Sequence, residues 1–292
     1  MKKSGRWFWL VLGLLAILLV GWLFIGWWNS DIVKIKTAKV GKGTIEQIVT
    51  ASGFVDAPVY ELGPKIGGKI MQIYVKEGEE VGAGETLAEF DDTTRLVAPA
   101  SGVIAKINYE IGETASPAQP VIVIVNYNKS WVAAQIDEID IAGVVIGDKA
   151  KITSDVYPDK AYAGEIYWIA PLAELRKVGG RVKMDEESYV FPCKIRFLGD
   201  HDELKVNMSV NADVITKRKD GTLIIPREAL FSKDDSSYIF SIKNGRAYEK
   251  KIEIGIRSFS SLEASSGLGE GEIVATSNLS KLKNKGRVSI ER

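Results

Sequence analysis

An internal repeat limits the folds open to this chain more than any other feature. Residues 67–90 read GGKIMQIYVKEGEEVGAGETLAEF, residues 101–124 read SGVIAKINYEIGETASPAQPVIVI, and the two segments align without a gap. Each contains G-x-I-x-x-I, then a Gly-Glu turn at Gly78 or Gly112, then a second apolar run. Alternating apolar positions build a half-buried sheet, and glycine adopts turn conformations that other residues resist. The repeat therefore predicts a small flattened β-sandwich with pseudo-two-fold symmetry.

The rest of the chain after residue 31 also has the pattern of strands. Short runs rich in Val, Ile and Tyr alternate with Gly, Asp and Asn turns, and no segment keeps a helical apolar period over three turns. Hydrophobic residues make up 46% and charged residues 26%, which excludes a mainly disordered chain. A length of 292 residues suggests two or three domains. We therefore predict a mainly β protein.

The N-terminal segment predicts a membrane anchor. No charged residue occurs from Trp7 to Ser30, and the apolar core Trp7–Trp28 is long enough, as a helix, to cross a bilayer core of about 30 Å. The basic residues Lys2, Lys3 and Arg6 all precede it, so the N-terminus is expected in the cytoplasm and the rest of the chain on the other side. A cleaved signal peptide is the alternative, but its apolar region would be shorter and would end in small residues.

Charge and cysteine content exclude some classes of function. The chain has 38 basic and 38 acidic residues, and three of the basic ones precede the anchor, so the body is slightly acidic. Nucleic-acid binding needs a basic face and is not expected. The only cysteine, Cys193, cannot form an internal disulfide. We expect it to be a small half-buried strand residue, with an intermolecular bridge or a reactive thiol as alternatives.

Two motifs within the repeat resemble a known fold. They are G-K-I-x-x-I-x-V-x-x-G-x-x-V at Gly68–Val81 and A-P-A-S-G-V-I at Ala98–Ile104. Both resemble the biotinyl/lipoyl fold, in the version found in membrane fusion proteins, the HlyD-like periplasmic adaptor subunits of efflux pumps. Further motifs follow in the order typical of that family: Trp131–Ile141 resembles the opening of its β-barrel, Lys205–Val214 its closing strand, Leu223–Leu230 the return to its membrane-proximal domain, and Gly267–Val274 its late turn.

The resemblance implies a fold with discontinuous domains. A transmembrane helix would be followed by a membrane-proximal β domain, a biotinyl/lipoyl-like β-sandwich and a β-barrel domain. The implied bounds are 1–30 for the cytoplasmic tail and anchor, 31–58 for the first part of the membrane-proximal domain, 59–127 for the lipoyl-like domain, 128–216 for the barrel, and 217–292 for the second part of the membrane-proximal domain.

The connection between the two halves of the repeat departs from the family pattern. Many of these adaptors insert a long helical hairpin there, but here the halves are joined by the five polar residues Asp91–Arg95, whereas even one marginal helix needs about 12 residues. We predict that the hairpin is absent. Enzyme carriers with this fold present a modified lysine at the same place. Asp91–Leu96 contains no lysine, and Lys69 and Lys76 are not expected at the tip, which speaks against a carrier.

No constellation in the sequence points to catalysis. The only histidine, His201, lies in the polar stretch Gly199–Asp202, which predicts a turn rather than a Ser-His-Asp triad. One His and one Cys cannot assemble the common zinc sites. Asp137, Glu138 and Asp140 alternate with isoleucines, which is typical of the wet side of a surface element, with a cation site as the alternative. The sequence has no P-loop and no complete dinucleotide-binding glycine motif. We therefore predict no enzymatic activity, no cofactor and no metal.

Two segments are candidates for contact with a partner. The polar stretch Leu172–Pro192 predicts a flexible barrel loop, with a partner-contact loop as the functional alternative. The second candidate is Leu223–Leu230. The residues that we single out are Leu172, Arg176, Lys177, Arg181, Lys183, Leu223, Arg227 and Leu230.

The resemblance implies a geometric function. Several copies would form a homo-oligomeric ring outside the membrane and would couple a transporter in the same membrane, with an ABC-type partner favoured, to the passage of substrate during export. The protein would then be a single-pass protein of the inner or cytoplasmic membrane with a periplasmic or extracellular body. The alternatives are a structural envelope protein and an anchored biotin/lipoyl-type carrier subunit.

Overall fold

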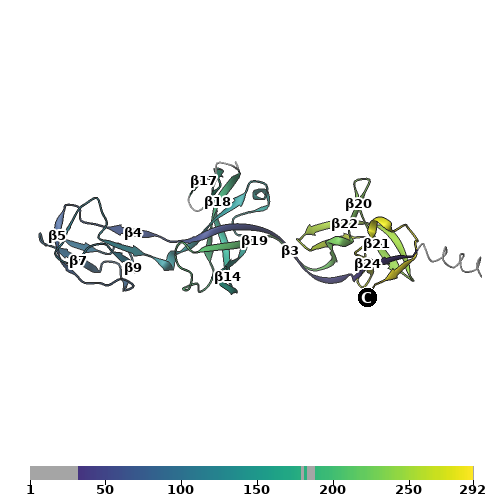
Figure 1. Ribbon diagram of the computed structural model, residues 1–292, viewed down its shortest axis with the longest axis horizontal. Helices are drawn as coiled ribbons and strands as arrows, with labels where there is room; N and C mark the ends of the chain where they lie inside the picture. Colours follow the sequence, from purple (N-terminus) through teal and green to yellow (C-terminus); the bar gives the residue numbers. More distant parts are fainter. Residues whose placement is uncertain (1–31, 179–180, 183–187, 292) are drawn as a thin grey trace, which may run out of the picture. The chain divides into compact units, whose positions relative to one another are not determined.

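The computed structural model describes residues 32–178, 181–182 and 188–291 (Figure 1). Within these ranges nearly every regular element is a strand, which confirms the mainly β class. The helical elements described are single 3₁₀ turns, namely η1 (Tyr127–Lys129), η2 (Ile141–Gly143), η3 (Arg227–Ala229) and η4 (Leu279–Lys281). The predicted anchor, Trp7–Trp28, lies outside the described residues. In the described part, no helix has the length and apolar character that a membrane span requires.

The chain divides into two compact units. The central unit is Ile48–Thr216, and the terminal unit combines the described residues up to Gln47 with those from Lys217 onward. Two long strands, β3 (Gly41–Asp56) and β19 (Ser209–Pro226), contribute residues to both units.

Within the central unit, the repeat folds as the predicted sandwich. Its strands form two four-stranded sheets with the orders β10-β5-β7-β8 and β4-β11-β9-β6 (Figure 1). The strands are β4 (Val59–Leu62), β5 (Gly68–Ile73), β6 (Glu80–Val81), β7 (Thr86–Phe90), β8 (Arg95–Val97), β9 (Gly102–Ile107), β10 (Thr114–Ala115) and β11 (Ile122–Val125).

The two halves of the repeat exchange equivalent hydrogen bonds. The N–H of Gly78 donates to the C=O of Ile104 at 2.8 Å, and the N–H of Gly112 donates to the C=O of Ile70 at 2.8 Å. Accordingly, β6 of the first half pairs with β9 of the second, and β10 of the second half pairs with β5 of the first. Gly78 and Gly112 have φ of 85° and 96°, a region that side chains disfavour. The predicted pseudo-two-fold symmetry is therefore present in the backbone itself.

The core of the sandwich consists of the apolar positions that the repeat aligns. Ile70 and Ile104 are fully buried, and so are the aligned residues Leu87, on β7, and Val121, immediately before β11. Because each half contributes the same positions, the halves share one apolar core, and neither has a core of its own.

The second part of the central unit is a closed barrel. Its strands follow the order β13-β14-β18-β12-β3-β19, and β19 pairs back with β13 from Lys149↔Ile215 to Thr153↔Asn211. Closure leaves no open sheet edge in this ring of strands. Val132, Ala134 and Ile136 alternate into the barrel core from β12. The remaining bounds are β12 (Trp131–Asp137), β13 (Lys149–Ser154), β14 (Tyr157–Ile169) and β18 (Tyr189–Phe197).

The terminal unit joins distant parts of the chain. Val33–Ile35 (β1) pairs in parallel with Val288–Ile290 (β25). Its main sheet has the order β19-β23-β22-β21-β24-β2, with β20 on β21. These strands are β2 (Thr37–Lys39), β20 (Phe231–Lys233), β21 (Ser236–Lys243), β22 (Arg246–Arg257), β23 (Ser261–Ser266) and β24 (Ile273–Ala275).

A buried carboxylate holds the irregular part of this sheet. The β22–β23 register shifts between Ile254 and Arg257, and the N–H of Ile256 donates instead to Glu263 Oε2 at 2.9 Å. Glu263 is 2% exposed, accepts a hydrogen bond from Thr222 at 3.0 Å and forms an ion pair with Lys219. These groups lower the pKa of Glu263, the Ile256 N–H first and the Lys219 ammonium second.

Candidate partner-contact surfaces

The turn between the two sandwich halves is tight. The N–H of Phe90 donates to the C=O of Thr94 at 2.9 Å, and Asp92 accepts hydrogen bonds from the Thr94 N–H and hydroxyl at 2.8 and 2.7 Å. These bonds lower the pKa of Asp92. The predicted absence of a helical hairpin at this connection is confirmed. Lys69 stands on β5 beside the turn rather than in it, and its C=O accepts the N–H of Asp91 at 2.9 Å.

The segment Leu172–Pro192 contains paired strands and is not the open loop that the sequence suggested. β15 (Glu174–Leu175) pairs with β18 at Val190 and Tyr189, and β16 (Lys177–Val178) pairs with β17 (Arg181–Val182) as a short hairpin. The sequence did not predict these strands, because many of their residues are charged and a two-residue strand is too short to show apolar alternation. Lys183 lies outside the described residues.

The candidate residues of this segment differ in what they offer a partner. Leu172 is 74% exposed. Arg176 is already engaged, since its Nε donates to Ser188 Oγ at 3.1 Å and its guanidinium forms an ion pair with Asp137. Lys177 and Arg181 lie on the two strands of the hairpin.

The other candidate segment, Leu223–Leu230, belongs to the terminal unit. Leu223 and Leu230 are partly buried against the apolar core of that unit, so both serve packing. Arg227 is exposed, and its N–H donates to the C=O of Ser260 at 3.0 Å. Of the three residues singled out here, Arg227 is therefore the exposed one.

The acidic group after β12 is not arranged around a cation. Within the described residues, no group of three His, Cys, Asp or Glu side chains is placed to hold a metal ion. Asp137 faces Arg176, whereas Glu138 and Asp140 are exposed.

His201 lies in a turn, as predicted. Its ring stacks on Phe197 with centroids 4.0 Å apart, its Nδ1 is 2.8 Å from the C=O of Gly199, and its Nε2 is 2.7 Å from the hydroxyl of Ser130. Because a carbonyl only accepts, Nδ1 carries the proton in the neutral ring and Nε2 accepts from Ser130. A backbone carbonyl thus occupies the place that a carboxylate takes in a triad, so the ring ties its loop to Ser130.

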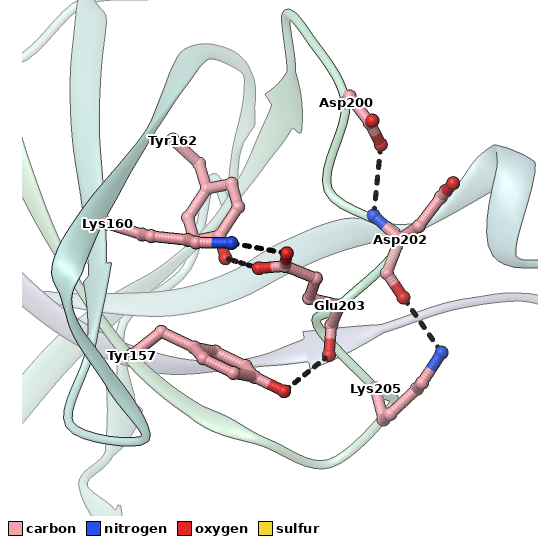
Figure 2. A network of polar contacts seen from close by, with 7 residues as sticks. All are labelled: Tyr157, Lys160, Tyr162, Asp200, Asp202, Glu203 and Lys205. Atoms are coloured by element: carbon pink, nitrogen blue, oxygen red, sulfur yellow. Dashed lines mark hydrogen bonds and ion pairs between the residues drawn. The ribbon is translucent and has the colours of Figure 1, made fainter.

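A polar cluster beside His201 fastens the same loop to β14 (Figure 2). The Tyr162 hydroxyl donates to Glu203 Oε2 at 3.1 Å, and Lys160 forms an ion pair with the same carboxylate. Hydrogen bonds from Lys160 and then Tyr162 lower the pKa of Glu203. Lys205 Nζ donates to the C=O of Asp202 at 2.8 Å. The Glu203 carboxylate and the Lys160, Tyr162 and Lys205 side chains are all engaged with neighbouring groups, so the arrangement holds the loop in place.

Cys193 is fully buried in the barrel core on β18, deeper than the half-buried position expected. Burial raises the pKa of its thiol to about 12, so the thiolate is essentially absent at neutral pH.

Two family models match the chain in tandem. The model described as "RND MFP, barrel-sandwich hybrid domain" matches residues 59–127, and the model described as "YknX-like beta-barrel domain" matches residues 130–214. The chain belongs to the membrane fusion protein family. The members of this family are adaptors and are not enzymes.

Individual relatives agree with this assignment. This membrane fusion protein is 27% identical over 175 residues to the putative efflux system component YknX of Bacillus subtilis (strain 168), an alignment that covers 59% of this chain and 46% of the relative. It is 25% identical over 188 residues to the macrolide export protein MacA of Escherichia coli O157:H7, covering 63% of this chain and 48% of the relative. The chain thus spans about half the length of the curated relatives it matches.

A solved structure shares the fold. The crystal structure of MacA from Actinobacillus actinomycetemcomitans superimposes with a TM-score of 0.65 at 18% identity, covering 82% of this chain and 99% of that chain. A chimera of MacA with the α-hairpin domain of MexA from Pseudomonas aeruginosa gives a TM-score of 0.60 at 19% identity, covering 80% of this chain and 98% of that chain.

Sequence reasoning missed one exposed apolar group of this membrane fusion protein. Ile139, Val145 and Ile146 all lie open to solvent in the connection between β12 and β13. The sequence did contain a sign of this group. Three large aliphatic residues occur in a stretch that also contains Gly143 and Gly147, which predicts a loop, and a surface loop is ordinarily polar.

Proposed function

We propose that this membrane fusion protein is the extracytoplasmic adaptor subunit of an export complex. The observation that carries the proposal is the tandem of the sandwich, matched at residues 59–127, and the barrel, matched at residues 130–214, in a chain whose two ends meet in one further β unit. The relatives named above are described as an efflux system component and a macrolide export protein, which supports a role in export.

In this proposal the protein acts through contacts and not through chemistry. Several copies form a ring, Trp7–Trp28 anchors each copy with its N-terminus in the cytoplasm, and the body stands on the other side of the membrane. The domain bounds proposed are 31–58 with 217–292 for the membrane-proximal domain, 59–127 for the lipoyl-like domain and 128–216 for the barrel. His201 and Asp137, which sequence reasoning considered for catalysis or metal binding, are engaged in structural contacts, which supports this view.

The partner is a transporter in the same membrane, which supplies the energy. An ABC-type transporter with extracytoplasmic domains is favoured, because the turn at Asp91–Arg95 leaves no hairpin to span toward a distant channel. Leu172 and Arg227, which are exposed, are the contact candidates that the surface favours among those singled out. A carrier role is disfavoured by the lysine-free turn.

The test is co-purification of the full-length chain from its native membrane with the transporter encoded beside it. ATPase and export rates of that transporter are then measured with and without this subunit. We expect recovery of a complex and a loss of export when the subunit is deleted. A transporter that neither co-purifies nor changes its activity would leave a structural envelope role as the better account. N-terminal sequencing tests the anchor, since a mature chain starting near residue 30 would contradict it.

A further inference from the structure

The two units of this membrane fusion protein carry opposite net charges. The described residues of the terminal unit include 18 Lys and Arg against 11 Asp and Glu, a net of +7. The central unit has 16 Lys and Arg against 26 Asp and Glu, a net of −10. The neutral total of the chain conceals this difference, which indicates that the two units face different partners.

Hydrogen bonds gather three distant stretches at one edge of the terminal unit. The N–H of Lys285 donates to the C=O of Ala247 at 2.7 Å, and Arg246 Nη1 donates to the C=O of Lys285 at 3.0 Å. The segment before β25 therefore lies against the start of β22. The N–H of Val33 donates to the C=O of Arg287 at 3.2 Å, so β1 lies beside the same segment. As a result, β1, the β21–β22 turn and the segment before β25 share one surface.

These stretches are rich in exposed basic side chains. From Asn278 to Ile290 the sequence has no acidic residue. Asn278 Nδ2 donates to the C=O of Lys34 at 2.8 Å, which also ties the start of η4 to β1. We call the exposed basic residues of this surface the basic patch, which consists of Lys34, Lys36, Lys243, Arg246, Lys281, Lys283 and Lys285. Among the residues that the structure describes, none of these side chains forms an ion pair.

The basic patch lies next to the point where the described chain begins. Ile32 directly precedes β1, and residues 29–31 alone separate it from the apolar segment Trp7–Trp28. Since one residue spans at most about 3.6 Å, Ile32 lies within roughly 14 Å of the end of that segment. Ile32 and Ile290 are 37% and 47% exposed, and aliphatic side chains among basic ones suit the boundary between lipid headgroups and acyl chains.

The composition of the basic patch favours a lipid surface over a protein. All its members but Arg246 are lysines, which are depleted in protein interfaces, because burial costs the long side chain its hydration and rotamer freedom. A bilayer that carries anionic lipid attracts lysines that stay hydrated, so no matching pocket is needed. At the border of the patch, Glu249 is paired with Lys233 at 3.3 Å and Glu291 is exposed, which leaves the surface strongly positive. The same surface of a second copy would be repelled.

We propose that the basic patch binds the headgroups of anionic phospholipids in the membrane that anchors the chain. The phosphate oxygens accept hydrogen bonds from the ammonium groups, and Ile32 and Ile290 rest against the outer part of the acyl layer. The inference rests on the anchor of the proposed function. It adds a contact that depends on lipid charge and that holds the terminal unit against the bilayer.

The test uses the full-length chain in vesicles that hold no transporter. A fluorophore on Ser289→Cys, which pairs with Lys34 inside the patch, reports contact with nitroxide-labelled headgroups. A matched probe on Ser260→Cys lies beyond the other end of β22. Cys193 is buried and does not compete for the label. We expect quenching at position 289 to rise about threefold when phosphatidylcholine vesicles receive about 30% phosphatidylglycerol, and to change little at position 260. Salt at about 1 M should remove the rise.

Charge variants identify the side chains responsible. The triple variant Lys281→Gln, Lys283→Gln, Lys285→Gln should reduce the phosphatidylglycerol-dependent quenching at least about fivefold, since each lysine near an anionic surface adds about fivefold to its attraction. The control variant removes the same charge from exposed positions of the terminal unit outside the patch, and should keep the response. Its substitutions are Lys39→Gln, Lys217→Gln and Lys251→Gln.

The outcomes separate this inference from the proposed function. Equal responses of the two triple variants, or quenching at position 289 that does not depend on phosphatidylglycerol, would overturn the lipid contact. Quenching that appears only after the transporter is added would assign the basic patch to the transporter and would overturn it as well. In either case, co-purification of the transporter with the unaltered chain would leave the adaptor role intact. Failure of that co-purification beside a normal lipid response would refute the adaptor role alone.

Discussion

The β-sandwich and the terminal unit have the same secondary structure, but different interactions determine the two. In the sandwich, the turn at Gly78 in the first half and the turn at Gly112 in the second half donate equivalent hydrogen bonds to the opposite half. The core between the two halves is apolar. In the terminal unit, Val33 pairs with Val288, the carboxylate of Glu263 binds a backbone N–H of β22, and that of Glu272 binds the N–H of Gly269 in the turn before β24. The first region depends on local symmetry and apolar burial, whereas the second depends on distant pairing and on groups that titrate.

The largest expected effect tests the equivalence of the sandwich halves. Ile70→Ala and Ile104→Ala each remove a fully buried side chain at aligned positions, and each should lower the free energy of unfolding by about 3 kcal/mol. The two losses should agree to within about 1 kcal/mol, because the surroundings correspond. Amide hydrogen exchange followed by mass spectrometry of sandwich peptides measures both. A large loss at one site with none at the other would contradict a shared symmetric core.

The second prediction concerns the carboxylate that holds the terminal sheet. Glu263→Ala leaves the Ile256 N–H and Thr222 without their acceptor, and should destabilise the terminal unit by about 2–3 kcal/mol. Glu253→Ala on neighbouring β22 is the exposed control.

Two spectroscopic signals can separate the units in that experiment. Trp131 and Trp168 are the only tryptophans after residue 31, and both lie in the central unit. In a fragment that starts at Ile32, denaturant should therefore change the circular dichroism of Glu263→Ala earlier than its tryptophan fluorescence. Coincident, unshifted transitions would show that the carboxylate is dispensable.

Acid should distinguish the same two regions. The folded-state pKa of Glu263 is lowered, chiefly by the Ile256 N–H and Lys219. Partial burial would raise the pKa of Glu272, but hydrogen bonds from Lys250 and Ser241 lower it on balance. A lowered folded pKa gives stability that is present above the unfolded pKa, about 4.3 for Glu, and lost as pH falls through the folded value.

The terminal unit should therefore unfold more readily at pH 3 to 4 than at pH 7, by more than the sandwich does. Glu263→Gln cannot titrate at this position and should reduce that difference. Unfolding midpoints measured at both pH values on the same fragment provide the check. An unchanged pH response in Glu263→Gln would mean that other groups control acid sensitivity.

The smallest expected effect returns to the symmetric turns. No atom lies within 4 Å of a Cβ added at Gly78 or Gly112, so an alanine there meets only the strain of positive φ. Gly78→Ala and Gly112→Ala should each cost about 1 kcal/mol, equally and at every pH. Amide hydrogen exchange at the two turns measures both losses of stability. Unequal losses would contradict the equivalence of the Gly78 and Gly112 turns.

Sequence reasoning reached the sandwich because its determinants are local and occur twice. The alignment of Ile70 with Ile104 and of Gly78 with Gly112 is visible in the letters alone, and the structure confirms both the burial and the turns. The pairing of Glu263 with Ile256 was out of reach, since it depends on a register shift that has no sequence signature. The exposed aliphatic residues between β12 and β13 were missed because Ile139 and Ile141 look alike in a sequence, whereas in the structure Ile141 packs against the barrel core and Ile139 is exposed.

The exchange of edge strands in the sandwich has a consequence for the chain while it is being made. The first half appears about 30 residues before the second, an interval of roughly 2–6 s at typical rates of synthesis. During that time β5 has no β10 and the partner strand of β6 does not exist. The nascent first half therefore has unpaired strand edges, without the shared core, that can pair with other chains. This waiting period ends only when β9 and β10 emerge, so slow translation between the halves would favour aggregation over closure.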